Sequence, residues 1–381
     1  MTHSWIKPSD ITQWTDSYFN RTRKIIEQYG DQNVTYAIFM RRPVISAPAL
    51  AVEWLQDISS FRGVPFKIDI LHKETEWIGA GEALMHVSGS FAHLVDLETL
   101  LLQKIGACCV AAYHAFQMCS ELPDVQFLAM EARHCAGSEM AQMMSYAAYV
   151  GSSRAKRKVS AKGFIGNATH ATSHFFGNES GLGTMPHALI GYAGSTLKAA
   201  QIFHQSFPNL PLTVLVDYFG AEITDSLEVC REFKALAKQG LLSIRLDTLG
   251  GRYVEGLDPE KSYAVLERHA PDSIRGYRSP RELQYLIGTG VSAAAIWHLR
   301  EQLDSKGFEH TKIVASSNFG PEKCRVMAMA KAPIDIIGTG SFLPRDWHET
   351  YATADIIEYD GVSKVKKGRE FLLKNTPHSS L

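Results

Sequence analysis

Short apolar runs recur through the second part of the chain, and each is followed by a polar or glycine-rich turn and a stretch with helical spacing. The runs are Val125–Ala129, Thr213–Asp217, Leu242–Asp247, Lys312–Ala315 and Ile334–Ile337. Their apolar positions are continuous rather than alternating, which is typical of parallel strands covered on both faces. Strands and helices repeated at this spacing predict an α/β fold with an irregular (β/α) barrel over residues 126–345.

The first part of the chain, residues 1–125, mixes strand and helix patterns and predicts a smaller α+β domain. Residues 34–40 are rich in β-forming side chains, and residues 82–89 alternate like a half-buried strand. Between residues 94 and 118 the apolar positions recur at helical spacing, which predicts a long core helix.

The end of the chain returns to a strand pattern. Residues 353–361 predict a strand that runs into a turn, and a basic stretch follows at residues 364–369. We therefore expect this tail, residues 346–381, to pack back on the N-terminal domain.

The composition is that of an ordinary globular protein. Of the 381 residues, 21% are charged and 45% are hydrophobic, and the formal net charge is −1, so we expect no nucleic-acid partner. The densest basic segment, Arg154–Lys158, is interpreted as a solvated loop or a rim that grips phosphate. The six cysteines form no C-x-x-C pair, the N-terminus lacks a signal-peptide pattern, and no apolar run approaches the roughly 20 residues of a membrane helix. These features predict a reduced, cytoplasmic protein with no membrane partner.

Polar side chains gather where the predicted strands end, which is where barrels of this kind carry functional groups. Asp217 and Asp247 each end a strand, and two such carboxylates suit Mg²⁺ shared with substrate oxygens, or ribose hydroxyls. Arg245 points the same way as Asp247 along its strand and suits a phosphate group. The alternative is a structural arginine–aspartate pair in the barrel interior. Arg133 also follows a strand, and its guanidinium suits a planar carboxylate.

Two turns rich in glycine and hydroxyl side chains follow consecutive strands, at residues 316–318 and 338–341. Small residues let backbone amides approach an anion closely, and hydroxyls add donors. In eight-fold barrels a phosphate group often lies between the last two strand loops. Each turn alone is equally well explained by backbone geometry, whereas the two together favour a phosphate site. Its predicted members are Ser316, Ser317, Gly338, Thr339 and Gly340.

His187 ends the segment Gly183-Thr184-Met185-Pro186-His187, whose proline and glycine place it at the edge of a loop. Near neutral pH a histidine can serve as a nucleophile or carry a proton. An isolated histidine is more often a structural hydrogen-bonding group. The interpretation of His187 as a catalytic residue therefore depends on the polar strand ends that follow it in the chain.

Together these segments resemble the nicotinate phosphoribosyltransferase family. The strongest matches are Gly183–His187, Arg245–Asp247 and Gly338–Gly340, and the likeness extends from Thr15–Tyr18 to the tail. Enzymes of this family join nicotinate to phosphoribosyl pyrophosphate in NAD salvage, with ATP hydrolysis coupled to the reaction and Mg²⁺ present. The resemblance implies a smaller N-terminal domain, an irregular α/β barrel, and a head-to-tail homodimer with shared active sites.

The resemblance also implies roles for individual residues. His187 would be phosphorylated transiently by ATP, and Arg133 would bind the nicotinate carboxylate. Tyr18 would stack on the pyridine ring from the partner subunit, although by sequence chemistry alone its segment is an ordinary helix start.

For the second substrate, the resemblance implies that Asp217, Arg245 and Asp247 bind the ribose and the pyrophosphate, with Mg²⁺ held by Asp217 and Asp247. Arg41 or Arg42 would reach phosphates across the subunit interface. The remaining residues that it places against substrate or phosphate are Thr184, Ser316, Ser317, Gly338, Thr339 and Gly340.

The chain departs from the family pattern at several positions, and these departures keep alternatives open. Met130 stands where members carry an aromatic ring, and the strand ends at Asp217 and Asp247 each lack a second acid. The substrate could instead be quinolinate or nicotinamide, and a catalytically silent relative that binds pyridine nucleotides is a further alternative. A barrel aldolase or isomerase would need a Schiff-base lysine at a strand end, and the sequence shows no convincing one.

Overall fold

The computed structural model describes residues 7–183, 185–345 and 352–375. It contains two compact units, the first formed by Met1–Phe116, Cys135–Arg154 and Pro344–Leu381, and the second by Gln117–His134 and Ala155–Leu343. The sequence pattern predicts one domain over residues 126–345, whereas Cys135–Arg154 belongs with the first unit.

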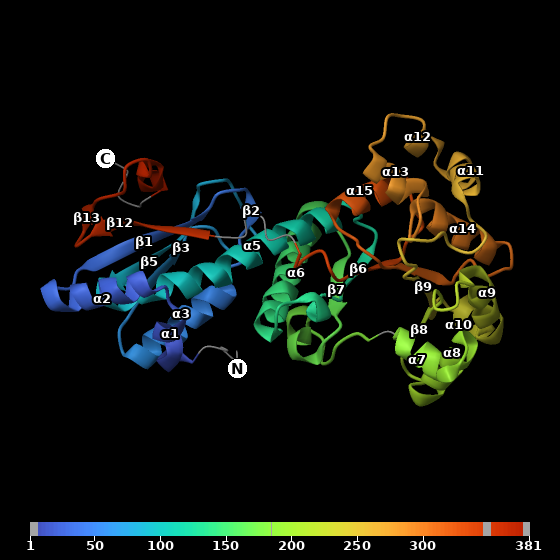
Figure 1. The fold of residues 1–381 in the computed structure, drawn as a ribbon, viewed down its shortest axis with the longest axis horizontal. Helices are drawn as coiled ribbons and strands as arrows, with labels where there is room; N and C mark the ends of the chain where they lie inside the picture. Colours follow the sequence, from blue (N-terminus) through green and yellow to red (C-terminus); the bar gives the residue numbers. More distant parts are fainter. Residues whose placement is uncertain (1–6, 184, 346–351, 376–381) are drawn as a thin grey trace. The chain divides into compact units, whose positions relative to one another are not determined.

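A five-stranded antiparallel sheet forms the centre of the first unit, with the strand order β13-β12-β1-β5-β3 (Figure 1). Its strands are β1 (Asn33–Met40), β3 (Lys67–Ile70), β5 (Ala83–Ser90), β12 (Ala352–Tyr359) and β13 (Val362–Ser363). β12 pairs with β1 from Val34↔Tyr359 to Met40↔Ala352, so the tail supplies a strand beside the first strand of the chain. The predicted return of the tail is confirmed.

Helices and short elements complete the first unit. They are η1 (Pro8–Asp10), α1 (Ile11–Trp14), α2 (Ser17–Tyr29), β2 (Val44–Ile45), α3 (Ala49–Arg62), β4 (Trp77–Ile78), α4 (Phe91–Leu94), η2 (Val95–Leu97), α5 (Glu98–Glu121), α6 (Ser138–Val159) and η5 (Glu370–Asn375). The last residues of α5 and α6 fall in the second unit. The predicted core helix is confirmed as α5. The basic stretch Arg154–Lys158 is not a loop, because it forms the last turns of α6. The helix dipole stabilises positive side chains at this end of a helix.

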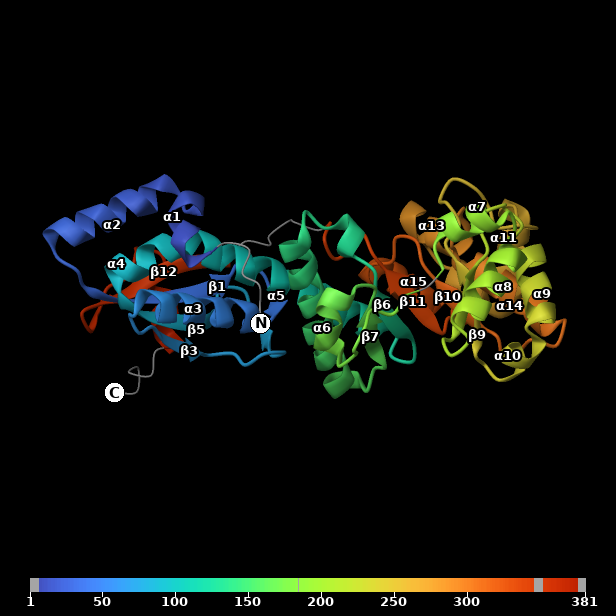
Figure 2. The ribbon, with the colours of Figure 1, turned by 90° about the horizontal axis from the view of Figure 1, so that it is seen from below.

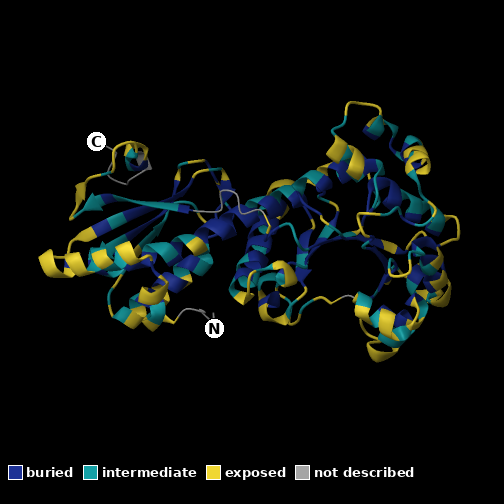
Figure 3. Cartoon of the chain, in the orientation of Figure 1, coloured by how far each residue is buried: buried dark blue, intermediate teal, exposed yellow. Residues whose placement is uncertain are grey.

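Six parallel strands form the sheet of the second unit, in the order β7-β6-β11-β10-β9-β8. The strands are β6 (Gln126–Ala129), β7 (Gly163–Asn167), β8 (Leu212–Leu215), β9 (Leu242–Leu246), β10 (Lys312–Ala315) and β11 (Ile336–Thr339). Most of their residues are buried, as Figure 3 shows in dark blue, and β9 is buried throughout. The predicted α/β class and its parallel strands are confirmed. In the described residues β7 and β8 are the edge strands, so the barrel is irregular.

The helices of the second unit lie between and around these strands (Figure 2). They are η3 (Ala132–His134), η4 (His170–Phe176), α7 (His187–Ala193), α8 (Thr196–Ser206), α9 (Glu222–Glu232), α10 (Lys234–Lys238), α11 (Pro259–His269), α12 (Pro271–Ile274), α13 (Pro280–Ile287), α14 (Ala293–Asp304) and α15 (Pro321–Met329). Local signals start several of them: Ser279 and Glu282 form a capping box at α13, and Pro259 and Pro321 stand at the first positions of α11 and α15. None of the helices in the described ranges is both long and apolar enough to cross a lipid bilayer.

Candidate active site

The carboxyl edge of the parallel sheet brings several predicted site residues into a row. Asp217 follows β8, Asp247 follows β9 and Ser316 follows β10, while Thr339 ends β11. Because β8, β9, β10 and β11 are neighbours in the sheet and run in the same direction, their ends meet at one edge.

His187 and Asp217 form a pair at this edge. His187 is the first residue of α7, and its Nε2 lies 3.0 Å from Oδ1 and 3.1 Å from Oδ2 of Asp217. The histidine side chain is 44% exposed, whereas the aspartate is 9% exposed. A carboxylate can only accept a hydrogen bond, so it favours the tautomer with the proton on Nε2 and the lone pair on Nδ1. The pair therefore leaves the Nδ1 lone pair on a half-exposed ring, which is the arrangement that a nucleophilic role requires. The ring of Tyr218, in a segment where the family pattern is broken, has its centroid 6.4 Å from that of His187.

Arg245, Asp247 and Ser316 form a second, buried cluster. The Arg245 guanidinium donates from Nε to Ser316 Oγ at 2.9 Å and from Nη2 to Asp247 Oδ2 at 3.0 Å. The Ser316 hydroxyl lies 2.9 Å from Asp247 Oδ1. Burial lowers the pKa of Arg245, and the charge of Asp247 acts in the opposite direction. The arginine–aspartate pair of the structural alternative is thus present, and it holds both side chains at the strand ends.

Arg133 lies in the short helix η3 that follows β6. Its Nε donates to Nε2 of His134 at 3.3 Å, and burial together with the Arg133 charge lowers the pKa of His134. Nε2 of His134 can accept this hydrogen bond only when the ring is neutral, because a protonated ring nitrogen has no lone pair. The charge of Arg133 also contributes to the lowered pKa of Arg245, although burial is the larger cause.

The two predicted phosphate turns are closely packed. Ser317 and Asn318 adopt left-handed φ angles of 81° and 57°. Thr339 Oγ1 donates to the carbonyl oxygen of Phe319 at 3.1 Å and so joins the turn after β10 to the end of β11.

Packing also explains two of the predicted phosphate-site glycines. A Cβ at Gly338 would lie 2.8 Å from the sulfur of Met130, and one at Gly340 would lie 3.1 Å from the Met130 carbonyl oxygen. Neither glycine has a positive φ. Close approach of β11 to Met130 therefore favours glycine at both positions, and a phosphate contact remains a prediction for them.

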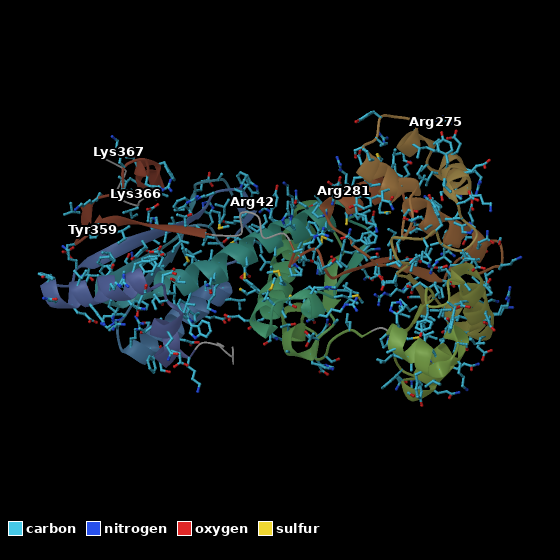
Figure 4. All side chains as sticks on the ribbon, in the orientation of Figure 1. Arg42, Arg275, Arg281, Tyr359, Lys366 and Lys367 are labelled. Atoms are coloured by element: carbon cyan, nitrogen blue, oxygen red, sulfur yellow. The ribbon has the colours of Figure 1, made fainter. Side chains whose placement is uncertain are left out.

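Three predicted site residues belong to the first unit. Tyr18 is 58% exposed on α2, and its hydroxyl lies 3.2 Å from Asp16 Oδ2. Arg41 Nε lies 3.3 Å from Thr353 Oγ1, and Arg42, labelled in Figure 4, lies over the ring of Tyr113 at 5.8 Å. The predicted substrate-binding residue Thr184 lies outside the described residues.

Sequence reasoning missed Lys323, in the first turn of α15. The side chain is only 5% exposed, and its Nζ donates to the carbonyl oxygen of Ser317 at 2.8 Å. The ammonium lies 4.3 Å from the ring centroid of Phe319, and burial lowers the pKa of Lys323 to about 7. A lysine after Gly-Pro-Glu at a helix start has the pattern of a surface residue, so its burial left no signal in the sequence.

Glu222 and Arg252 were missed as well. Glu222 is fully buried at the start of α9 and accepts hydrogen bonds from Thr248 Oγ1 at 2.8 Å and from Arg252. Nη2 of Arg252 also donates to the backbone carbonyl of Asp217 at 3.0 Å. This network fixes the backbone at Asp217 through its carbonyl oxygen.

Carboxylates for a metal ion are few at this edge. Within the described part of the chain, no three His, Cys, Asp or Glu side chains come together in a group that could hold a metal. Asp217 and Asp247 follow neighbouring strands, and Mg²⁺ commonly takes one or two carboxylates and completes its shell with water and substrate phosphates, so a magnesium ion at these two residues stays a prediction.

The parallel sheet with its row of polar strand ends, together with the smaller antiparallel unit, defines an α/β protein whose fold is shared with solved nicotinate-nucleotide pyrophosphorylases. No protein-family model and no curated protein matches the chain in sequence. Solved structures match it along most of its length. A nicotinate-nucleotide pyrophosphorylase from Pyrococcus furiosus has a TM-score of 0.69 at 22% identity, covering 97% of this chain and 81% of that one.

Two further structures show the same fold. A nicotinate-nucleotide pyrophosphorylase from Ehrlichia chaffeensis has a TM-score of 0.59 at 12% identity and covers 93% of this chain and 99% of that chain. Human nicotinic acid phosphoribosyltransferase also has a TM-score of 0.59, at 14% identity, and covers 92% of this chain and 75% of that chain. At these identities the similarity establishes the fold.

Proposed function

We propose that this protein is a nicotinate phosphoribosyltransferase of NAD salvage, which forms nicotinate mononucleotide from nicotinate and phosphoribosyl pyrophosphate while hydrolysing ATP. The observation that carries this proposal is the His187–Asp217 pair, with 3.0 Å between Nε2 and Oδ1, beside the Arg245–Asp247–Ser316 cluster. The fold shared with the pyrophosphorylases and the human transferase supports the same reaction class.

The ATP step uses His187 as a nucleophile. The Nδ1 lone pair attacks the γ-phosphorus of ATP, the bond to the β,γ-bridging oxygen breaks, and ADP leaves. The ring then carries a phosphoryl group on Nδ1 and a proton on Nε2. Asp217 stabilises the positive charge that this ring acquires, because its carboxylate already lies at hydrogen-bond distance from Nε2. Water later takes the phosphoryl group and restores the free histidine.

The glycosyl step joins the two substrates. Arg133 binds the nicotinate carboxylate, and the ring nitrogen attacks C1′ of the ribose while the bond from C1′ to the pyrophosphate oxygen breaks. Arg245 and Asp247 hold the ribose and pyrophosphate, and the turns at Ser316 and Thr339 hold the 5′-phosphate. Fixed donors of this kind stabilise the charge that develops on the leaving group.

Asp217 and Asp247 would hold Mg²⁺ together with pyrophosphate oxygens, and the ion would neutralise part of the leaving-group charge. We also propose a homodimer with shared active sites. In it the exposed ring of Tyr18 stacks on the pyridine of the partner's site, and Arg41 or Arg42 reaches its phosphates.

The test is formation of nicotinate mononucleotide from nicotinate and phosphoribosyl pyrophosphate with Mg²⁺, measured with and without ATP. Wild type should show product that rises with ATP, and His187→Ala should lose at least about 100-fold of that rate because its nucleophile is gone. Labelled ATP should place an acid-labile phosphate on wild type but none on His187→Ala. His310→Ala is the matched control, because His310 is an exposed histidine of the same unit.

The alternatives predict other outcomes. Product from quinolinate with release of carbon dioxide and no effect of ATP would identify a quinolinate phosphoribosyltransferase, and ATP-stimulated product from nicotinamide alone would change the pyridine. No product from any of the three pyridines would overturn the proposal in favour of a catalytically silent relative.

A further inference from the structure

The turn after β10 holds an unusual backbone conformation without glycine. Ser317 and Asn318 both have φ in the left-handed region, at 81° and 57°. Residues with a Cβ are disfavoured there, and two in succession persist only where the surroundings fix them. The contacts around this turn therefore need a physical account.

Two side chains from neighbouring elements hold the carbonyl groups of the turn. Lys323 Nζ donates to the Ser317 carbonyl at 2.8 Å, and Thr339 Oγ1 donates to the Phe319 carbonyl at 3.1 Å. In a planar trans peptide the C=O and the following N–H point in opposite directions. Holding these two carbonyls thus directs the N–H groups of Asn318 and Gly320 away from Lys323 and Thr339. Backbone N–H groups on one side of a turn can line a concave anion site.

The chemistry of Lys323 does not suit a simple space-filling role. Its side chain is 5% exposed and packs beside the rings of Phe319, at 4.3 Å, and Tyr285, at 5.7 Å. A methionine or leucine would fill the same space without desolvating an ammonium group. Burial lowers the pKa of Lys323 to about 7, because the charged ammonium loses its hydration in this environment. The charged form therefore carries a substantial desolvation cost. An anion bound at the turn would favour the charged form.

We propose that Lys323 is a positioning residue for the phosphate subsite: it holds the turn at residues 316–319 in its anion-binding form and places a buried positive charge behind it. This inference rests on the proposed function for the identity of the anion, the 5′-phosphate of phosphoribosyl pyrophosphate. Lys323 is too buried to meet a substrate carbonyl, so it acts through the turn and not as a Schiff-base lysine.

The test uses Lys323→Met in the full chain, with two readouts. Titration calorimetry with inorganic phosphate should show binding weakened roughly tenfold, because the variant loses a charge-assisted hydrogen bond to the turn. In the transferase assay the KM for phosphoribosyl pyrophosphate should rise by a similar factor while kcat changes less than about threefold. A purely structural residue would lower the melting temperature and the active fraction instead, and would leave the KM unchanged.

Lys312→Met is the matched control, since Lys312 is exposed at the opposite end of β10, and it should bind phosphate like wild type. If Lys323→Met fails to fold, Thr339→Val removes the other tether with nearly the same shape and should also weaken phosphate binding. The inference would be overturned if Lys323→Met and Thr339→Val both bound inorganic phosphate as tightly as wild type, or if wild type bound no phosphate. A wild type that binds phosphate but forms no product contradicts the proposed function alone, and the calorimetry still tests Lys323.

Discussion

The surroundings of Glu98, the first residue of α5, disfavour the ionised form of its carboxyl group. It lines a cavity of about 510 Å³ together with Asp16 and Tyr18. Burial, with smaller contributions from the charges of Asp355 and Asp16, raises the pKa of Glu98 to about 7. The attraction of a helix N-terminus for a carboxylate, about 0.3–1 kcal/mol, acts in the opposite direction and is too small to reverse the effect.

The raised pKa gives stability a defined pH dependence. The folded chain binds the Glu98 proton more tightly than the unfolded chain, whose value is 4.5, so this stabilisation is complete below pH 4.5 and is lost as the pH rises through about 7. Glu98→Gln removes the titration. We therefore expect the variant to gain stability relative to wild type between pH 5 and pH 8, by on the order of 2 kcal/mol, as measured by thermal melting.

Glu121→Gln serves as the control, because Glu121 is an exposed carboxylate at the other end of the same helix. Its difference from wild type should stay constant over this pH range. Parallel pH curves for Glu98→Gln and wild type would show that Glu98 is an ordinary surface carboxylate.

The residues that could be predicted from the sequence are those whose identity and place on a strand already carry chemistry. Asp217, Asp247 and Ser316 follow predicted strands, so the apolar strand pattern was enough to predict that they lie along one edge of the sheet. Lys323 and Glu222 could not be found, because their roles depend on burial and on partners from other elements, such as Ser317 and Arg252.

At the scale of elements, the contact of α5 with α6 depends on one glycine. A Cβ at Gly151 would lie 2.1 Å from the carbonyl oxygen of Ala112 and 2.8 Å from Cβ of Ala115. Both neighbours belong to α5, and a helical carbonyl cannot move aside as a flexible side chain can. This close approach explains why residues 135–154 belong to the first unit rather than to the barrel.

Gly151→Ala should therefore destabilise the protein, although alanine is the better helix former. The gain in helix propensity is about 1 kcal/mol, whereas overpacking costs roughly 1–3 kcal/mol, and a contact of 2.1 Å with a backbone carbonyl favours the upper end of that range. We expect a lower melting temperature in calorimetry. Gly251→Ala is the control, because no atom lies within 4 Å of a Cβ built there and its φ is not positive, so its melting temperature should match wild type. Equal melting temperatures for both variants would mean that the helices separate without cost.

The elements with a regular pattern were predictable, and those that depend on close approach were not. Continuous apolar runs identified β6, β8, β9, β10 and β11, which are covered on both faces. β7 was missed because its sequence, Gly-Phe-Ile-Gly-Asn, is interrupted by glycines. A Cβ at Gly166 would lie 2.6 Å from Cδ1 of Leu182, so the strand and this side chain are closely packed. The sequence also did not predict that α6 belongs mostly to the first unit. That assignment depends on the close approach at Gly151, and a single glycine in a helix has no distinctive pattern.

At the scale of the whole molecule, neither unit is a continuous piece of chain. β12 comes from the tail and lies between β13 and β1, and β6 precedes α6 yet lies between β7 and β11 in the parallel sheet. Each sheet therefore needs segments that are far apart in sequence. We expect the two units to require one another's connecting segments for folding, which makes activity tests on variants of the full chain more informative than tests on fragments.

The proposed shared site makes a specific demand on the dimer. Tyr18 belongs to the first unit and His187 to the second. If Tyr18 serves the partner's site, a dimer of one Tyr18→Ala subunit and one His187→Ala subunit has one site lacking both residues and one site that is intact. Each variant alone should be inactive, whereas co-expression should restore about a quarter of wild-type activity, because half of randomly assembled dimers are mixed and each has one working site.

The matched control is co-expression of His187→Ala with Asp217→Ala. These two side chains are paired within one unit at 3.0 Å, so each mixed dimer has two damaged sites and should remain inactive. Recovery in the first mixture alone would therefore require a site built from two subunits, since subunit exchange or partial refolding would restore both mixtures equally. If neither mixture recovers while Tyr18→Ala alone is inactive, Tyr18 serves its own subunit. An active Tyr18→Ala enzyme would instead remove this ring from the site and leave pyridine binding to the barrel residues.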